Sequence, residues 1–252
     1  MSLQTIATLA RIASVEHVNS DRRAHWRHPD TTLNYARAAV QVGLWASERK
    51  LITQYFKQTD RILELGCGGG RVGLGMWQIG YQNVLLSDFS PEMVSITQGV
   101  LRQAGAGFKV EVADACKLPY SDESFDGVIF AFNGLMCMRG QADRLLALPE
   151  IHRVLKSNGK FLFTANDREK GEHVNEWRSE PPLPDGQLGD RWHETDSTPV
   201  FMHSSTEAET VAELRQFNFN IIQTALRSEI ASENARVRAF AGETRFYVAE
   251  RA

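Results

Sequence analysis

The sequence predicts an α/β fold, in which a doubly wound and mostly parallel sheet carries helices on both faces. Three short apolar segments are the basis of this prediction: residues 61–65, 84–88 and 110–115. Each reads as a strand buried on both faces, as in parallel sheets, and helix-like patterns follow the first two. Regular alternation of strands and helices is typical of a parallel sheet, because its crossover helices cover both faces.

Length and composition narrow the possible functions. A chain of 252 residues can bury the core of one elaborated α/β domain, and a net charge of −3 argues against broad nucleic-acid binding. No run approaches the ~18 apolar residues of a membrane span, and the N-terminus lacks a signal-peptide core, so we expect no membrane contact. The three cysteines, Cys67, Cys116 and Cys137, are an odd number in or beside predicted strands. We therefore expect no disulfide framework and no metal site, and a cytoplasmic location.

We divide the chain, as one domain over 1–252, into four parts. Residues 1–57 form an N-terminal helical cover, in which Asp30, Thr31 and Thr32 supply N-cap chemistry for a helix reaching Leu51. Residues 58–165 form the ligand-binding core, 166–206 an insertion and 207–252 the C-terminal strands. Within the core and the C-terminal part we predict strands over 61–65, 84–88, 108–112, 125–132, 160–164, 219–224 and 244–250, and helices starting near 71, at Ser90-Pro91 and at 145.

The insertion is rich in proline, glycine and aromatic residues between 177 and 203, which excludes a long helix there. Long excursions of this kind are more often functional than neutral, so we expect it to face the substrate. A short strand over 199–203 is predicted within it.

Glycines follow the first apolar segment directly, within residues 66–70. Glycine takes positive φ and leaves no Cβ between backbone and ligand, and the next helix would direct its free N–H groups into the same space. The following two segments end in carboxylates, Asp88 and Asp114. A carboxylate about 20 residues past the glycines can reach ribose hydroxyls. We therefore expect one crevice for a nucleotide-like ligand at the carboxyl edge of the sheet, between the first and fourth strands.

The chain resembles the class I S-adenosylmethionine-dependent methyltransferases, in particular the small-molecule branch that includes the ubiquinone-biosynthesis enzymes. The resemblance covers roughly residues 55 to 165 and rests on Glu64-x-Gly66-x-Gly68-x-Gly70, Asp88-Phe89-Ser90-Pro91-Glu92-Met93, Asp114-Ala115 with Leu118-Pro119, and the segments 124–128 and 150–159. One departure is Ser157-Asn158-Gly159, where that branch usually has Pro-Gly-Gly. The resemblance implies a Rossmann-like sheet of seven strands, with the seventh antiparallel and joined to the sixth through residues 227–242.

The resemblance also implies S-adenosyl-L-methionine as the methyl donor. Glu64 would hold the glycine turn or the donor's amino group, Asp88 the ribose hydroxyls and Asp114 the adenine amino group. The alternatives are that Asp88 is simply an acid at a helix N-terminus, and that Tyr35 is ordinary core packing. The donor-binding residues expected in this way are Tyr35, Glu64, Gly66, Cys67, Gly68, Gly70, Asp88, Phe89, Met93, Asp114, Ala115 and Phe132.

Methyl transfer from a sulfonium is an in-line displacement at carbon, for which alignment of the two reactants can supply ~7–11 kcal/mol. A general base is needed only if the acceptor must lose a proton. His193, His203 and Asp167 are the candidates, because they follow the fifth strand. The alternative for each is a surface or packing role.

We therefore predict a cytoplasmic methyltransferase that acts on a small-molecule acceptor, with the oligomeric state left open. The alternatives are an RNA methyltransferase that uses the basic segment 21–28, a donor-binding protein without transferase activity, and a nicotinamide oxidoreductase. The last is considered because Gly68 to Gly73 fits the pattern G-x-G-x-x-G.

Overall fold

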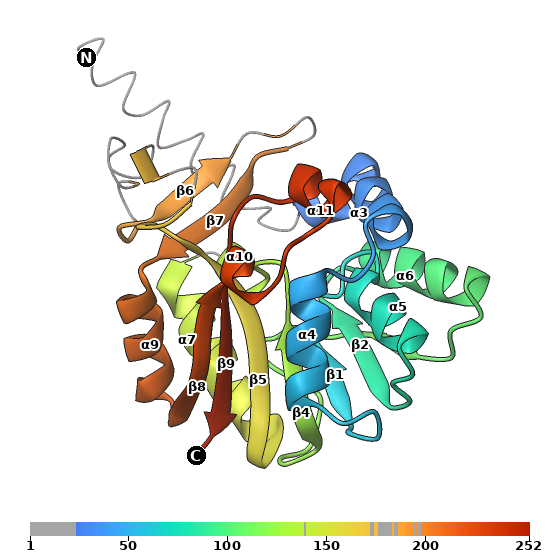
Figure 1. The fold of residues 1–252 in the computed structure, drawn as a ribbon, viewed down its shortest axis with the longest axis horizontal. Helices are drawn as coiled ribbons and strands as arrows, with labels where there is room; N and C mark the ends of the chain where they lie inside the picture. Colours follow the sequence, from blue (N-terminus) through green and yellow to red (C-terminus); the bar gives the residue numbers. More distant parts are fainter. Residues whose placement is uncertain are drawn as a thin grey trace, which may run out of the picture.

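Seven strands form the body of the protein, as the main part of a nine-stranded sheet. The computed structural model describes residues 24–138, 140–171, 174–175, 183, 186–193, 195 and 198–252. In the sheet the strands lie in the order β3-β2-β1-β4-β5-β9-β8 (Figure 1). Their bounds are β1 Ile62–Glu64, β2 Val84–Asp88, β3 Lys109–Val112, β4 Phe125–Phe130, β5 Leu155–Asp167, β8 Phe219–Leu226 and β9 Arg245–Arg251.

The strand directions confirm the predicted fold class. β1 to β5 pair in parallel, and β9 runs antiparallel to both β5 and β8. The order reverses at β1, whose Leu63 is paired with Leu85 of β2 on one side and with Val128 of β4 on the other. Between β8 and β9 lie two short helices, α10 (Arg227–Ile230) and α11 (Ala235–Phe240), in the stretch where the sequence predicts a loop or short helix.

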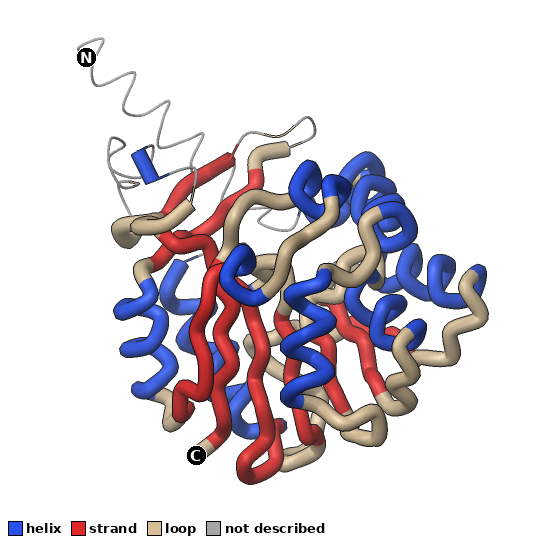
Figure 2. The backbone as a smooth tube through the Cα atoms, viewed as in Figure 1, coloured by secondary structure: helices blue, strands red, loops and turns tan. Residues whose placement is uncertain are grey.

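Helices cover both faces of the sheet (Figure 2). One face packs against α4 (Ala46–Tyr55), α5 (Arg71–Gln78), α6 (Pro91–Gln103), α10 and α11, and the other against α7 (Gly140–Val154) and α9 (Glu207–Gln216). Neighbouring strand residues alternate between the two cores: Ile62 belongs to the first and Leu63 to the second, and both are fully buried. This alternation explains why the strands read as continuous apolar runs.

The N-terminal cover differs from the prediction. The sequence suggests one helix capped near Asp30, but the structure has α2 (Ala24–Arg27), α3 (Pro29–Gln41) and the separate α4. His28 is the N-cap of α3, because its Nδ1 accepts from the Asp30 N–H at 3.3 Å and Pro29 occupies the first turn. The chain then breaks at Gly43, whose φ of +68° does not continue a helix.

A β-hairpin lies beyond the carboxyl ends of the parallel strands. It consists of β6 (Asp190–His193) and β7 (Val200–Ser205), which matches the strand predicted over 199–203. β7 also pairs in parallel with the end of β5, where Asn166 faces Ser204. In Figure 1 the hairpin lies at the top with α3 and α11, over the end of the sheet where β1 and β2 finish. The predicted insertion residues Trp177, Pro181, Pro182 and Pro184 lie outside the described residues.

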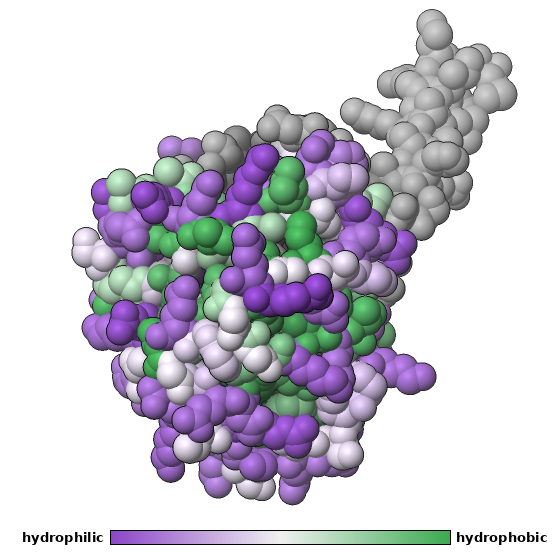
Figure 3. Space-filling model, turned by 90° about the vertical axis from the view of Figure 1, so that its right-hand side faces the viewer, coloured by the Kyte–Doolittle hydropathy of each residue, from purple (hydrophilic) through white to green (hydrophobic). Residues whose placement is uncertain are grey.

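The surface is mixed in character. On the face turned toward the viewer in Figure 3, hydrophobic side chains gather in places within a largely hydrophilic surface. Large exposed apolar residues among those described include Leu33 and Val40 on α3 and Trp77 on α5. Within the described part of the chain, no helix has the length and apolar character needed to cross a bilayer.

Candidate active site

A cavity of about 560 Å³ opens at the carboxyl ends of β1, β2 and β4. Its floor is the glycine turn after β1, and its roof comes from α2, α3, the hairpin and α11. Of the expected donor-binding residues, ten line it: Tyr35, Glu64, Gly66, Cys67, Gly68, Asp88, Phe89, Asp114, Ala115 and Phe132. The structure thus brings the ends of four neighbouring strands, β1 to β4, and the aromatic residue Tyr35 to a single space.

The glycine turn is built for close approach. Gly66, Gly68 and Gly70 have φ of +58°, +53° and +83°, a region that favours glycine. A Cβ on Gly69 would lie 2.3 Å from the carbonyl carbon and oxygen of Tyr35, so α3 lies directly against the turn. Gly70 is outside the cavity lining and acts as the N-cap of α5.

Asp88 holds the glycine turn from the neighbouring strand. Its Oδ2 accepts from the Gly68 N–H and its Oδ1 from the Ser90 N–H, both at 2.9 Å. Burial raises the pKa of the Asp88 carboxyl to about 6, while these amide donors act in the opposite direction. Asp88 therefore lies just before α6, as expected of an acid at a helix N-terminus, and it also lines the cavity. The backbone N–H of Phe89 also donates to this carboxylate, and three donors leave acceptor capacity for a ligand hydroxyl.

Glu64 is a buried carboxylate at the cavity floor. It is 2% exposed, and its Oε2 has no hydrogen-bond partner among the residues that the structure describes. Burial raises the pKa of Glu64 to about 8, and the nearby Arg71 guanidinium opposes the rise. A buried polar atom without a partner is costly. A cationic ligand group such as an ammonium would relieve that cost.

The turn also carries a buried ion pair that the sequence does not reveal. Arg71 donates from its two terminal nitrogens to the two carboxylate oxygens of Glu48, each at 2.6 Å, and its guanidinium lies 4.7 Å from the ring centroid of Trp45. Glu48 also accepts from the Trp45 N–H at the start of α4. Nothing in the sequence pairs Arg71 with an acid 23 residues away.

Aromatic rings enclose the cavity. Phe132, with φ of +51°, stacks on Phe240 at 5.0 Å and meets Tyr35 edge-on at 6.2 Å. Tyr35 in turn lies edge-on to Trp26 at 5.7 Å. Burial raises the pKa of the Tyr35 hydroxyl far above its ordinary value, so it stays neutral. Trp26 and Phe240 were not predicted, because each meets the site only through contacts between distant parts of the chain.

Met93 lies away from this space. It is fully buried in α6, outside the cavity lining, and its backbone N–H donates to the Ser90 side chain that caps the helix. The helix start predicted at Ser90-Pro91 is confirmed.

The three candidate bases also lie outside the cavity lining. His203 Nδ1 is 2.6 Å from Asp190 Oδ1, and Asp167 Oδ2 accepts from Arg245 Nε at 2.8 Å. Both pairs are buried, so each group is committed to a partner. His193 follows Trp192, which does line the cavity, and neighbouring strand residues point to opposite faces.

A histidine from another part of the chain lines the roof instead. His25, on α2, is 9% exposed, and its Nδ1 lies 2.8 Å from the carbonyl oxygen of Thr198. Burial lowers the pKa of His25. In the sequence it lies within the basic segment 21–28, and nothing there marks it as part of the site.

Comparisons with known proteins agree with this geometry. Residues 62–159 match the family model of a methyltransferase domain. A ubiquinone/menaquinone biosynthesis C-methyltransferase, UbiE, from Neisseria meningitidis serogroup C is 33% identical over 113 residues, which is 44% of this chain and 44% of that one. The chain thus spans less than half the length of the curated relatives it matches.

Solved structures extend the likeness of fold over most of the chain. The structure of an S-adenosylmethionine-dependent methyltransferase from Methanosarcina mazei superposes with a TM-score of 0.67 at 21% identity, covering 80% of this chain and 96% of that one. The [4+2]-cyclase SpnF superposes with a TM-score of 0.60 at 18% identity, covering 82% and 80%. Residues 62–159, which hold the strands and the glycine turn of the cavity floor, are thus similar to a methyltransferase domain, and most of the chain shares its fold with S-adenosylmethionine-dependent methyltransferases.

Proposed function

We propose that the protein transfers a methyl group from S-adenosylmethionine to a small, uncharged acceptor. The observation that carries the proposal is one cavity that joins two different linings. Its lining combines a polar set, made of the glycine turn, Asp88 and the Glu64 oxygen that has no partner among the described residues, with a set of aromatic side chains.

The residues present fit the donor. The Glu64 carboxylate suits the ammonium of its methionyl part, and the Asp88 oxygens suit the ribose hydroxyls beside the Gly68 backbone. Phe89, Asp114 and Ala115 line the wall next to Asp88 and would hold the adenine. When bound, the donor supplies a methyl group already activated by the positive charge on sulfur.

The chain's own contribution is alignment and exclusion of water. Tyr35 packs over Gly68 of the glycine turn, and Phe132 contacts the Tyr35 ring edge-on, so a donor held there would be covered by aromatic rings. Restricting both reactants to one geometry is worth ~7–11 kcal/mol in favourable cases, which is enough for a displacement at an activated carbon.

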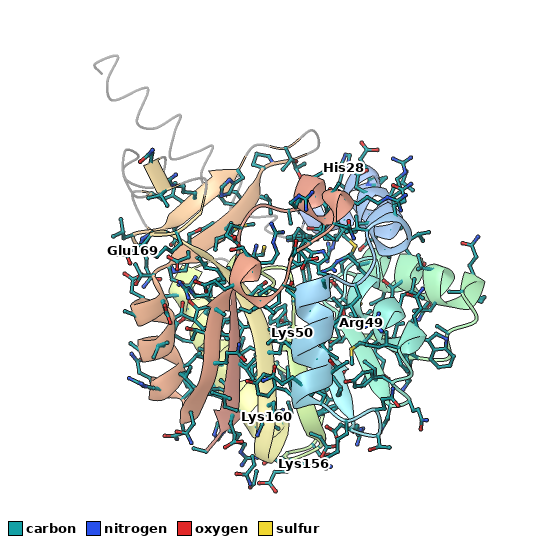
Figure 4. The ribbon with its side chains drawn as sticks, viewed as in Figure 1. His28, Arg49, Lys50, Lys156, Lys160 and Glu169 are labelled. Atoms are coloured by element: carbon teal, nitrogen blue, oxygen red, sulfur yellow. The ribbon has the colours of Figure 1, made fainter. Side chains whose placement is uncertain are left out.

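The acceptor side favours an uncharged molecule over a polyanion. The one cationic residue among the described lining side chains, Arg71, is neutralised by Glu48, whereas Asp88, Asp114 and Asp143 add negative charge. Lys156 and Lys160 lie at the lower edge of Figure 4, at the opposite end of the sheet from the hairpin. The described lining of the cavity therefore offers no unpaired cation to hold an RNA backbone.

The three free cysteines suit a reducing compartment such as the cytoplasm.

A second candidate is a protein that binds the donor without transferring its methyl group. SpnF, a [4+2]-cyclase, has the same fold, so the fold alone does not determine the reaction.

Two measurements on the full chain separate these candidates. Calorimetry with S-adenosylhomocysteine tests the donor site, and we expect saturable binding with one ligand per chain. Incubation with isotope-labelled S-adenosylmethionine and a metabolite extract, with products resolved by mass spectrometry, tests transfer. Binding together with a labelled product supports the proposal, binding without any labelled product supports the second candidate, and absence of binding rejects both.

Binding of S-adenosylhomocysteine should also release a proton. At about pH 7 the Glu64 carboxyl, with a pKa of about 8, is mostly protonated in the free protein. An ammonium placed beside it favours the carboxylate, so affinity should rise with pH between about 6 and 8, with about one proton released per S-adenosylhomocysteine bound. Calorimetry in buffers of different ionisation enthalpy counts that proton. Glu64→Gln should remove the release, and equal enthalpies for the wild type in all buffers would contradict this assignment.

A further inference from the structure

We propose that His25 is the general base of the transfer and that the acceptor reacts through an ionisable hydroxyl group. This inference rests on the proposed function and names the acceptor chemistry of the same site. It concerns a residue of the N-terminal cover, outside the residues 62–159 that match the methyltransferase domain.

The position of His25 places it beside the donor half of the cavity. Its ring contacts Trp26 edge-on at 4.9 Å, and Trp26 contacts Tyr35 edge-on at 5.7 Å. The Tyr35 ring lies 3.0 Å from the point where a Cβ on Gly68 would be. A continuous row of rings therefore runs from the glycine turn to the imidazole, and all of these residues line one cavity.

The hydrogen bond to Thr198 fixes the tautomer of His25. Nδ1 lies 2.8 Å from the Thr198 carbonyl oxygen and 3.2 Å from its Oγ1. A carbonyl oxygen can only accept, so Nδ1 carries the hydrogen, and in the neutral ring Nε2 carries the lone pair. No described residue forms a hydrogen bond with Nε2, and this is the nitrogen to which the proposal assigns the acceptor.

The surroundings keep the ring neutral and ready to accept a proton. Burial lowers the pKa of His25, and the neighbouring His28 lowers it further, although the Thr198 carbonyl acts against them. α2 packs against α3, which carries Asp30 and has His28 as its N-cap, and against α6, which carries Glu92. Glu92 lies 3.9 Å from Arg27 and accepts from Ser90 Oγ at 2.9 Å.

The other titratable groups of the lining suit this role less well. Glu64, Asp88 and Asp114 belong to the donor half, and burial raises the pKa of Cys67 and of Cys137. Asp143 is the remaining rival on the acceptor side. A base is required only when the acceptor must lose a proton, and an uncharged hydroxyl suits the aromatic, cation-poor side of the cavity.

The proposed step balances without any further reactant. The hydroxyl oxygen forms a bond to the methyl carbon while the carbon–sulfur bond breaks, and the electron pair of that bond remains on sulfur. Nε2 of His25 takes the hydroxyl proton and later passes it to water. The products are a methyl ether, S-adenosylhomocysteine and one proton.

The test uses His25→Asn in the full chain, with 4-nitrophenol as the probe and S-adenosylhomocysteine bound. Asparagine keeps an N–H donor close to the position of Nδ1, so the bond to Thr198 can persist, but it carries nothing at the position of Nε2. His28→Asn is the matched control, because His28 is a half-buried neighbour outside the cavity lining, labelled in Figure 4. The absorbance of the bound probe reports its ionised fraction without any turnover.

We expect the ratio of ionised to neutral bound probe, at about pH 6, to be about tenfold higher in the wild type and in His28→Asn than in His25→Asn. For a hydroxyl acceptor found in the labelled-donor screen, kcat/KM should fall about 100-fold or more in His25→Asn, with affinity for S-adenosylhomocysteine nearly unchanged.

Three outcomes would overturn the assignment: equal ionisation of the probe in His25→Asn and the wild type, absence of probe binding to the loaded wild type, or loss of the ionised probe in Asp143→Asn and not in His25→Asn. Failure of S-adenosylhomocysteine itself to bind would instead reject the proposed function on which this inference rests.

Discussion

Asp88→Ala is expected to weaken binding of S-adenosylhomocysteine by about 100-fold or more. The substitution removes the acceptor for the Gly68 and Ser90 N–H groups as well as the acceptor for the ribose. Hydrogen bonds to a charged group contribute about 1.5–3 kcal/mol each, so losing two or more corresponds to roughly 3–6 kcal/mol. Isothermal titration calorimetry on the folded variant measures the change directly.

Asp126→Ala is the matched control for this loss. Asp126 also accepts from a backbone N–H, that of Arg61 at 2.8 Å, and it pairs with Lys156, but it is outside the cavity lining. Its replacement should leave the affinity within about threefold of the wild type, because no ligand contact is removed. Similar losses in the two variants would mean that Asp88 acts on overall stability and not on the donor site.

Glu48→Gln is expected to lower the free energy of unfolding by about 3–5 kcal/mol, because it leaves the Arg71 guanidinium buried without a compensating charge. Arg71 and Glu48 side chains are 8% and 2% exposed, so water cannot replace the lost partner. For a chain of this size the melting temperature should fall by about 10 °C. Urea unfolding monitored by circular dichroism would give the free energy.

The double variant Glu48→Gln with Arg71→Met tests the cause. Removing both charges should restore at least half of the lost stability, since replacing a whole buried pair is far less costly than breaking it. Asp122→Asn is the control, because it breaks the pair between Arg153 and an Asp122 side chain that is 74% exposed and should cost no more than about 1 kcal/mol. A double variant as unstable as Glu48→Gln would show that Glu48 acts through the Trp45 N–H instead.

The parts of the fold that depend on local pattern could be predicted from the sequence. Apolar runs bounded by glycine, serine and proline identify strands such as β2 and the start of α6, because burial on both faces and helix capping act within a few residues. The order of the strands around β1 then follows from the handedness of the crossovers, so the floor of the site could also be predicted.

The roof of the site could not be predicted in the same way. His25 meets Thr198 across 173 residues, and Phe240 stacks on Phe132 from a helix between the last two strands. Local pattern carries no information about such contacts. For the same reason His203 and Asp167 resemble bases in the sequence, although each is held in a buried pair by Asp190 or Arg245, which only the folded chain brings near.

The residues that form the roof of the cavity come from both ends of the described chain. Their positions determine the order in which the site can be completed during synthesis. The strands that hold the glycine turn, Asp88 and Phe132 have all left the ribosome well before Thr198 and Phe240 are translated. A nascent chain can thus form the glycine turn and the rest of the cavity floor early. The cavity is enclosed only when the hairpin and α11 have folded over it. The proposed methyl transfer would in this sense require translation as far as Phe240 and the strand that follows it.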